Sequence, residues 1–284
     1  MNKILAVSLY IPNQSKMILF ITSRCNSNCS HCLSSCGAEG TDMPETVFTQ
    51  AIDFINQVNP LVINVSGGEP TLHGDILPMI KRLKSEVYRN PEHNTEPQMT
   101  LITNGTFYSN SRIQLCNIQR TGINIQITHD TRFYKNSLTP ADLDELKKCS
   151  NDKLFVVTEI EDDHMIAYGN ALINNTGTSK TRVAPMCFNL RSLVTLSGFD
   201  FKRAVQEMER RLKFCAWAIK PNGEIILSES LLCPPVGSIT DSVQKITQNI
   251  REFRCRKCVY AQTLQHAGKI SNEQYHKVFG RPII

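Results

Sequence analysis

Short apolar runs alternate with amphipathic stretches along the first half of the chain. Five runs have the length of a buried strand, at residues 17–22, 61–65, 99–103, 123–128 and 154–160. The intervals between them carry apolar residues at helical spacing, with later helices expected near residues 75–88, 109–119 and 140–149. In the first interval Asp42 is the expected N-cap of a helix, and Pro44 lies in its first turn.

Strands that alternate with helices predict right-handed parallel βαβ units, and therefore an α/β fold. Five or six such units are too few to close an eight-stranded barrel, so we expect a partial barrel of the (β/α)6 type or an open sheet. In both forms ligands bind at the carboxyl ends of the strands. Four polar or cysteine-containing segments follow predicted strands and should meet at that rim: residues 24–33, 67–69, 103–105 and 128–130.

The second half of the chain has a different pattern. The alternation loosens before residue 198, which predicts a core domain at residues 1–198 and a small domain with a tail at residues 199–284. In the small domain two strand-like runs flank Asn222 and Gly223, as in a hairpin with an Asn-Gly turn. An amphipathic helix should follow, with its apolar positions at Val243, Ile246, Ile250 and Phe253.

Composition limits the class of protein and the compartment in which we expect it. A chain of 284 residues with 41% hydrophobic residues can bury a large core. It has no apolar stretch of membrane-spanning length and no signal peptide, so we expect a cytoplasmic protein without a membrane partner. Thiols stay reduced there, and 11 cysteines then indicate metal ligation before disulfides. The net charge of +5 would suit an acidic partner, but so mild an excess is typical of a solvated surface, so a nucleic acid partner is the less favoured interpretation.

Three cysteines follow the first predicted strand directly, as Cys25, Cys29 and Cys32 in the spacing Cys-x3-Cys-x2-Cys. Three thiolates so close on one loop can hold three irons of a 4Fe-4S cluster and leave the fourth iron open to a ligand. The alternative is a zinc site, which requires a fourth ligand to close it.

Together with the unaltered Gly-Gly-Glu-Pro at residues 67–70, the cysteine motif resembles the radical S-adenosylmethionine (radical SAM) superfamily. The resemblance covers about residues 17–159. It implies that the cysteine loop holds a catalytic 4Fe-4S cluster whose open iron chelates S-adenosylmethionine (SAM). His31 stands before the third cysteine, where relatives commonly have an aromatic residue, and is expected beside the adenine.

The resemblance also implies residues that bind SAM. Glycines at 67 and 68 would let the backbone approach the methionine moiety, and the Glu69 carboxylate would accept from its amine. Polar groups at the ends of the third and fourth strands would face the cofactor. These are Thr103, Asn104 and Thr128.

The tail is similar to the twitch or SPASM-type extension of some members, in which cysteines around a hairpin and after a helix hold a second, auxiliary 4Fe-4S cluster. The corresponding residues are Cys215, Cys233, Cys255 and Cys258. Zinc remains an alternative for these four cysteines, and Cys187 could replace one of them.

Candidates for proton transfer lie at or near strand ends on the same rim. They are His129, Asp130, Tyr134 and Glu159. The alternative roles for these side chains are capping turns or binding substrate hydroxyls.

The resemblance implies reductive cleavage of SAM to a 5′-deoxyadenosyl radical, with flavodoxin or ferredoxin as electron donor. The auxiliary cysteines favour oxidation or cross-linking of a peptide or protein side chain. Only 24 residues precede Cys25, fewer than a leader-binding domain needs, so dehydrogenation of a small polyol or sugar-like metabolite is the close alternative. RNA or nucleoside modification and a non-catalytic SAM sensor remain open as other classes.

Overall fold

The computed structural model describes most of the core and part of the second half of the chain. The residues described are 16–27, 34, 36–88, 95–105, 109–128, 139, 141, 142, 144, 148, 154–161, 167–173, 179–180, 216–227, 231 and 233–252. The proposed domain boundary near residue 198 lies outside them and stays a prediction.

One mixed sheet runs through the described residues, in the strand order β10-β9-β8-β1-β2-β3-β4-β5-β6-β7. Its strands are β1 (Lys16–Thr22), β2 (Val62–Gly67), β3 (Gln98–Thr103), β4 (Asn124–Thr128), β5 (Leu154–Glu161), β6 (Ala167–Ile173), β7 (Ser179–Lys180), β8 (Trp217–Ile219), β9 (Glu224–Leu227) and β10 (Gly237–Ser238). Strands β8 and β1 to β5 are parallel neighbours, and antiparallel strands extend both edges. The expected α/β class is confirmed.

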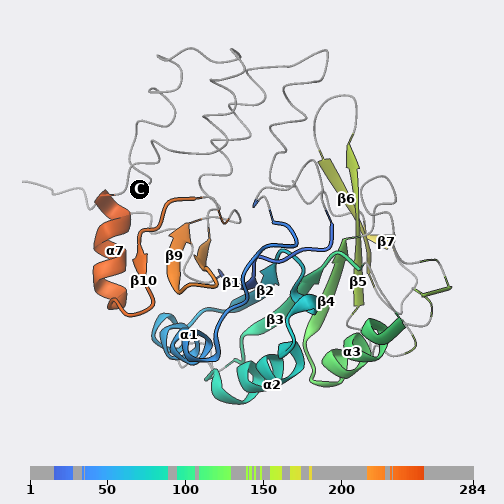
Figure 1. Cartoon of the computed structure of the whole chain (residues 1–284), viewed down its shortest axis with the longest axis horizontal. Coiled ribbons are helices and arrows are strands. Elements are labelled where there is room, and N and C mark those ends of the chain that lie inside the picture. The colour runs from blue at the N-terminus through green and yellow to red at the C-terminus, as the bar shows by residue number, and fades with distance from the viewer. Residues whose placement is uncertain are drawn as a thin grey trace, which may run out of the picture.

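Helices follow the first three strands, as the alternation predicts. They are α1 (Glu45–Val58), α2 (Ile76–Glu86) and α3 (Ser109–Arg120), with a short 3-10 turn η1 (Pro70–Leu72) before α2. All three helices lie on the same side of the sheet (Figure 1), because successive right-handed crossovers return the chain to the same face. The carboxyl ends of the strands are left for the site, as in a partial barrel.

The start of α1 differs from the sequence prediction. Pro44, not Asp42, occupies the N-cap position, and it makes no side-chain cap. The N–H of Met43 donates to the carbonyl of Ile21 at 2.7 Å, so the chain is still paired with the end of β1 at this point. Asp42 therefore lies beside the end of β1, where its carboxylate accepts a hydrogen bond from the hydroxyl of Thr22 at 2.6 Å.

The predicted helix at 140–149 is observed where the chain is described. Ala141, Asp142, Asp144 and Lys148 are helical. The Asp142 carboxylate accepts from the N–H of Thr139 at 2.8 Å, and the Thr139 hydroxyl in turn accepts from the N–H of Asp142 at 3.2 Å. This reciprocal capping box marks the start of the helix.

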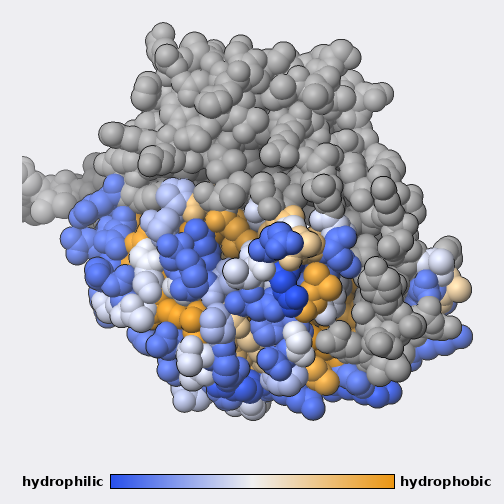
Figure 2. All heavy atoms as spheres, viewed as in Figure 1, coloured by the Kyte–Doolittle hydropathy of each residue, from blue (hydrophilic) through white to orange (hydrophobic). Residues whose placement is uncertain are grey.

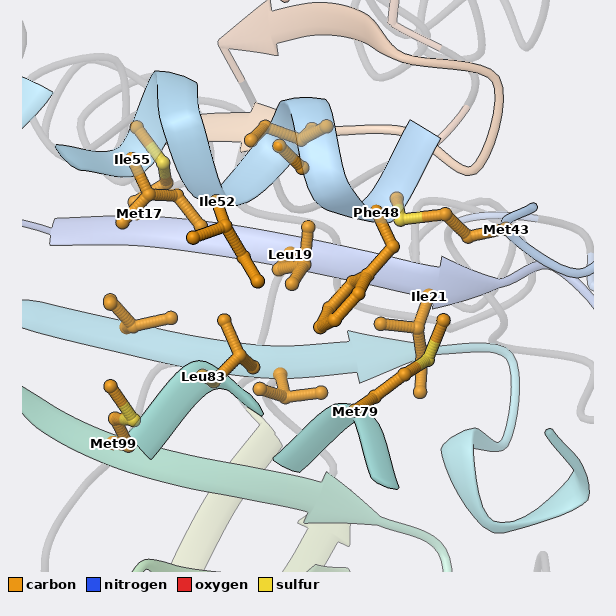
Figure 3. Packing of buried hydrophobic residues seen from close by; sticks show 14 of the residues in the cluster. Met17, Leu19, Ile21, Met43, Phe48, Ile52, Ile55, Met79, Leu83 and Met99 are labelled. Carbon is orange, nitrogen blue, oxygen red and sulfur yellow. The ribbon is translucent and has the colours of Figure 1, made fainter. Parts of the chain in front are cut away.

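The core lies between the helices and the sheet. Figure 3 shows Phe48 and Ile52 of α1 pointing toward Leu19 and Ile21 of β1, and all four are at most 2% exposed. The alternate residues of β1 face a second cluster on the opposite side, formed by Ile18, Phe20, Ala216, Ala218 and Ile226. Burial on both faces explains why this strand is a continuous apolar run rather than an alternating one.

The hairpin predicted after residue 215 is confirmed, with Gly223 at φ 83° in its turn. Its first strand, β8, pairs in parallel with β1, so the hairpin extends the core sheet. Trp217 stacks on Phe54 of α1 with ring centroids 6.2 Å apart. Helix α7 (Val243–Glu252) buries Ile246 and Ile250 in the same core. The hairpin and α7 thus share one core with β1 and α1.

The outer surface over the helices is mostly polar. Hydrophilic residues cover most of the visible outer surface over α1, α2 and α7 (Figure 2). No helix within the described part of the chain is long and apolar enough to cross a bilayer.

Cys116 on α3 is disulfide-bonded. At this position the expectation that the thiols are reduced is therefore wrong.

Candidate functional site

Three segments meet at the carboxyl ends of β1, β2 and β3. They contain Cys25 after β1, Gly67, Gly68 and Glu69 at the end of β2, and Thr103 and Asn104 at the end of β3. Because these strands are parallel neighbours, their carboxyl ends share one edge of the sheet. The sequence prediction that these segments share a rim is confirmed for these three, and Thr128 ends β4 at the same edge.

Gly67 and Gly68 lie directly against the chain that leaves β1. A Cβ added at residue 67 would stand 2.4 Å from the carbonyl oxygen of Thr22, and one at residue 68 would stand 2.3 Å from that of Arg24. The N–H of Gly68 donates to Thr22 at 2.9 Å, and the N–H of Glu69 donates to Arg24 at 2.8 Å. Glycine is required here because two backbones touch. The expected approach to a methionine moiety stays a prediction.

The cysteine loop is closed at its base by a second pair of backbones. The N–H of Cys25 donates to the carbonyl of Gly37 at 2.9 Å, and the N–H of Ser23 donates to that of Thr41 at 2.8 Å. A Cβ at Gly40 would stand 2.2 Å from the carbonyl carbon of Ser23. The sequence analysis did not predict these backbone contacts. Two glycines shortly after the cysteine motif were the available signal, because glycine allows two backbones to approach closely. Cys29, Cys32 and His31 lie outside the described residues.

The carboxylate of Glu69 is fully buried and accepts four hydrogen bonds from the protein. Its Oε1 accepts from the N–H of Thr71 at 3.0 Å, from the Thr71 hydroxyl at 2.6 Å and from the Thr103 hydroxyl at 2.7 Å. Its Oε2 accepts from the N–H of Asn104 at 2.7 Å. Burial raises the pKa of Glu69, and these hydrogen bonds oppose the increase.

All four of these partners are donors, which is what an ionised carboxylate needs. Glu69 therefore ties the end of β2 to the end of β3 from inside the protein. The predicted contact of Glu69 with the amine of SAM stays a prediction.

The side chain of Asn104 points to the cysteine loop. Its Nδ2 lies 3.0 Å from Oδ1 of Asn26, 3.1 Å from Oγ of Ser27 and 3.9 Å from Sγ of Cys25. The backbone N–H of Ser27 also donates to the same sulfur, at 3.4 Å. The Cys25 side chain, at 9% exposure, is thus buried among N–H donors, an environment that suits a thiolate ligand.

An ion pair holds the outer side of the same loop. Nε of Arg24 donates to Asp42 at 2.9 Å, and Nη2 of Arg24 donates to the carbonyl of Leu72 at 2.6 Å. Partial burial raises the pKa of Asp42, but the hydrogen bonds from Arg24 and Thr22, with the positive charge of Arg24, outweigh it and leave the pKa below its usual value. The pair connects the cysteine loop to the turn after Gly-Gly-Glu-Pro.

His73 is a structural residue of this turn. It is 5% exposed, its Nδ1 accepts from the N–H of Asp75 at 3.1 Å, and its Nε2 lies 3.2 Å from the carbonyl of Met43. An acceptor role for Nδ1 puts the ring proton on Nε2, which then donates to Met43.

Of the expected auxiliary ligands, Cys233 is described. It is half-buried and packs with Leu231 against the cluster around Ile18 and Phe20. The N–H of Leu231 donates to the hydroxyl of Ser34 at 3.0 Å, so the segment before Cys233 contacts the cysteine loop.

The structure does not describe the other predicted ligands of the auxiliary cluster. Cys215, Cys255, Cys258 and the alternative Cys187 lie outside the described residues. Within the residues that the structure does describe, no three His, Cys, Asp or Glu side chains form a metal site. The auxiliary centre stays a prediction.

The expected proton-transfer residues are not brought together by the described part of the chain. His129, Asp130 and Tyr134 lie outside it. Glu159 belongs to β5, opposite Gly169 of β6, and only its backbone is described. Their roles stay predictions.

Comparison with known proteins agrees with the core of the site. Residues 19–153 match the family model of the Radical SAM superfamily. This part of the chain, which contains all three rim segments, is therefore a Radical SAM superfamily domain.

A curated relative and several solved structures are similar to the chain. An uncharacterized protein of Methanocaldococcus jannaschii, MJ0907, is 31% identical over 144 residues, which are 48% of each chain. The chain thus spans about half the length of this relative. BtrN in complex with AdoMet and 2-DOIA is 14% identical at a TM-score of 0.47, with 82% of this chain and 81% of that chain covered.

Two peptide complexes are similar at the same level. The anSMEcpe structure with bound AdoMet and Cp18Cys peptide is 11% identical at a TM-score of 0.47, covering 93% of this chain and 87% of that one. Streptococcus suis SuiB bound to precursor peptide SuiA is 13% identical at a TM-score of 0.42, covering 88% and 70%.

Proposed function

We propose that the protein is a radical SAM enzyme that cleaves SAM reductively and uses the resulting 5′-deoxyadenosyl radical to abstract hydrogen from a substrate. The observation that carries the proposal is Cys25, held among N–H donors at the rim of a Radical SAM superfamily domain. Cys25, Cys29 and Cys32 would hold a 4Fe-4S cluster, with SAM on its open iron. When bound, this group supplies the electron that breaks a carbon–sulfur bond of SAM.

The chain's own residues have the tasks of holding and shielding this site. The backbone hydrogen bonds to Gly37 and Thr41 hold both ends of the loop that carries the three cysteines. Burial of Cys25 against Asn104 keeps water from one side of the loop. His31 and Thr128 would bind SAM, and proton transfer would fall to His129, Asp130, Tyr134 or Glu159.

The proposed reaction is oxidation or cross-linking of a peptide or protein side chain, with flavodoxin or ferredoxin as electron donor. Its support is the packing of Cys233 against β1 and the hydrogen bond from Leu231 to the cysteine loop. An auxiliary 4Fe-4S cluster on Cys215, Cys233, Cys255 and Cys258 could then accept the electron that the substrate radical loses as it is oxidised.

The first experiment is anaerobic reconstitution with iron and sulfide, followed by dithionite, SAM and measurement of 5′-deoxyadenosine. The wild-type protein should form it, and Cys25→Ala should not. Cys36→Ala is the matched control, since Cys36 is also buried but lies outside the motif. A fully reconstituted wild-type protein that forms no 5′-deoxyadenosine contradicts the proposal.

Iron and sulfide counts test the auxiliary centre. Cys25→Ala and Cys233→Ala should each retain about half of the wild-type iron, because each removes a ligand of one cluster of two. Wild-type iron in Cys233→Ala, or zinc in its place, contradicts a second iron-sulfur cluster held by this residue.

A further inference from the structure

The amide of Asn104 occupies a position from which it can act on the cluster. Its Nδ2 is within hydrogen-bond range of three acceptors on the cysteine loop, of which one is the sulfur of Cys25. An Asn amide carries two N–H groups, so the donors are shared among the oxygens of Asn26 and Ser27 and this sulfur. The side chain bridges the end of β3 and the first cysteine.

The bridge is anchored from behind. The backbone N–H of Asn104 donates to Oε2 of the fully buried Glu69, and the N–H of Gly105 donates to the hydroxyl of Thr103 at 3.2 Å. Gly105 has φ 67°, a left-handed conformation that turns the chain sharply at this point. With backbone and side chain both held, Asn104 has little freedom to swing away from Cys25.

Hydrogen bonds to ligand sulfurs change the reduction potential of an iron-sulfur cluster. Reduction adds negative charge that is partly carried by the sulfurs, so an N–H donor stabilises the reduced form more than the oxidised form and raises the potential. The effect is largest where solvent does not compete, and Cys25 is buried.

We propose that Asn104, held in place by Glu69, is a positioning residue that donates a hydrogen bond to the sulfur of Cys25 and raises the reduction potential of the catalytic cluster. The proposal rests on the function proposed above, because it requires that Cys25 is a cluster ligand. It adds a specific role for the Asn of the rim segment after β3, where sequence reasoning expected only contact with SAM.

The test is a potentiometric titration of the reconstituted cluster without SAM, followed by electron paramagnetic resonance. Asn104→Leu removes both N–H groups at similar size and should shift the midpoint to a more negative value at unchanged iron content. Ser27→Ala is the matched control. It removes a competing acceptor of the same amide and leaves the N–H of Ser27 on the sulfur, so its midpoint should not become more negative.

The outcomes separate the two proposals. A wild-type protein that assembles no cluster overturns the proposed function. A wild-type cluster whose midpoint is unchanged in Asn104→Leu overturns the role of Asn104 and leaves the function standing.

If Asn104→Leu does not retain iron, Asn104→Asp carries the test, because it keeps the shape and replaces the donor by an acceptor. A more negative midpoint in Asn104→Asp supports the proposal. A folded Asn104→Asp protein without iron contradicts it, since a donor that only tunes the potential is not needed for assembly.

Discussion

Backbone contacts of single residues decide how the cysteine loop is seated. Gly68 makes the closest of these contacts to Cys25, since its added Cβ would lie 2.9 Å from Cβ of Cys25 as well as against Arg24. Neither neighbour is the end of a flexible side chain, so one of the two backbones has to move.

Gly68→Ala should therefore lower the free energy of unfolding by about 1–3 kcal/mol and reduce iron retention. Gly74→Ala is the control, because nothing lies within 4 Å of its added Cβ, and it should change stability by less than about 0.5 kcal/mol. Urea unfolding and iron analysis measure both effects. Equal stability and iron content for the two variants would show that the backbones at residue 68 separate without cost.

The ion pair between Arg24 and Asp42 makes a pH-dependent contribution. The pKa of Asp42 is lower in the folded protein than its ordinary value of 3.8, so this stabilisation is present above that value and is lost as the pH falls through the folded pKa. The Asp42 side chain is 33% exposed and solvent screens the pair, so the contribution is about 1 kcal/mol at most.

Asp42→Asn should accordingly be less stable than wild type at neutral pH, and the difference should shrink as the pH falls below 3.8. Urea midpoints of both proteins across that range give the measurement. A difference that is independent of pH would mean that the charge of Asp42 contributes nothing.

Between elements, the contact from Leu231 to Ser34 links the hairpin side of the sheet to the cysteine loop. Removing the acceptor leaves a partly buried N–H without its partner, which costs about 1–3 kcal/mol locally. The contact joins residues 197 positions apart, so it depends on the tertiary structure.

Ser34→Ala should speed hydrogen exchange at the amide of Leu231 and lower the local opening free energy there. Ser85→Ala, which removes an exposed hydroxyl bonded within its own helix, should leave that amide unchanged. Mass-spectrometric exchange on matched peptides reports both. Unchanged exchange in Ser34→Ala would show that Ser34 does not hold the segment before Cys233.

Across the whole molecule, one core joins the two halves of the chain. Trp217 of β8 is fully buried against Phe54 of α1, and residues of α7 belong to the same cluster. Such a shared core predicts that β8 and α1 unfold together rather than as separate domains.

Trp217→Ala should destabilise the protein by about 3–5 kcal/mol, because the cavity opens where the halves meet. Tyr88→Ala is the aromatic control, since Tyr88 is 71% exposed. Far-UV circular dichroism during urea unfolding measures both. In the wild type, fluorescence of Trp217, the single tryptophan, should change together with the helical signal. Separate transitions would contradict a common core.

Local patterns were sufficient for the motif and for many of the elements, but not for β6 and β7, which lie where the alternation loosens. The apolar run of β1, the helical spacing of α1 and the Asn-Gly turn at Gly223 each depend on neighbours in sequence, and the structure has all three. The spacing of Cys25, Cys29 and Cys32 with Gly67 and Gly68 was likewise sufficient for the superfamily, which the family match supports.

Tertiary structure decided the roles within those elements. Asp42 has the sequence of an N-cap but pairs with Arg24, and Glu69 has the sequence of a ligand-binding carboxylate but accepts four donors from the protein. The place of β8 beside β1 joins strands about two hundred residues apart. The periodic pattern of apolar residues depends only on residues that are close in sequence. Which distant backbone touches a glycine, and which donors surround a carboxylate, depends on how the chain packs on itself.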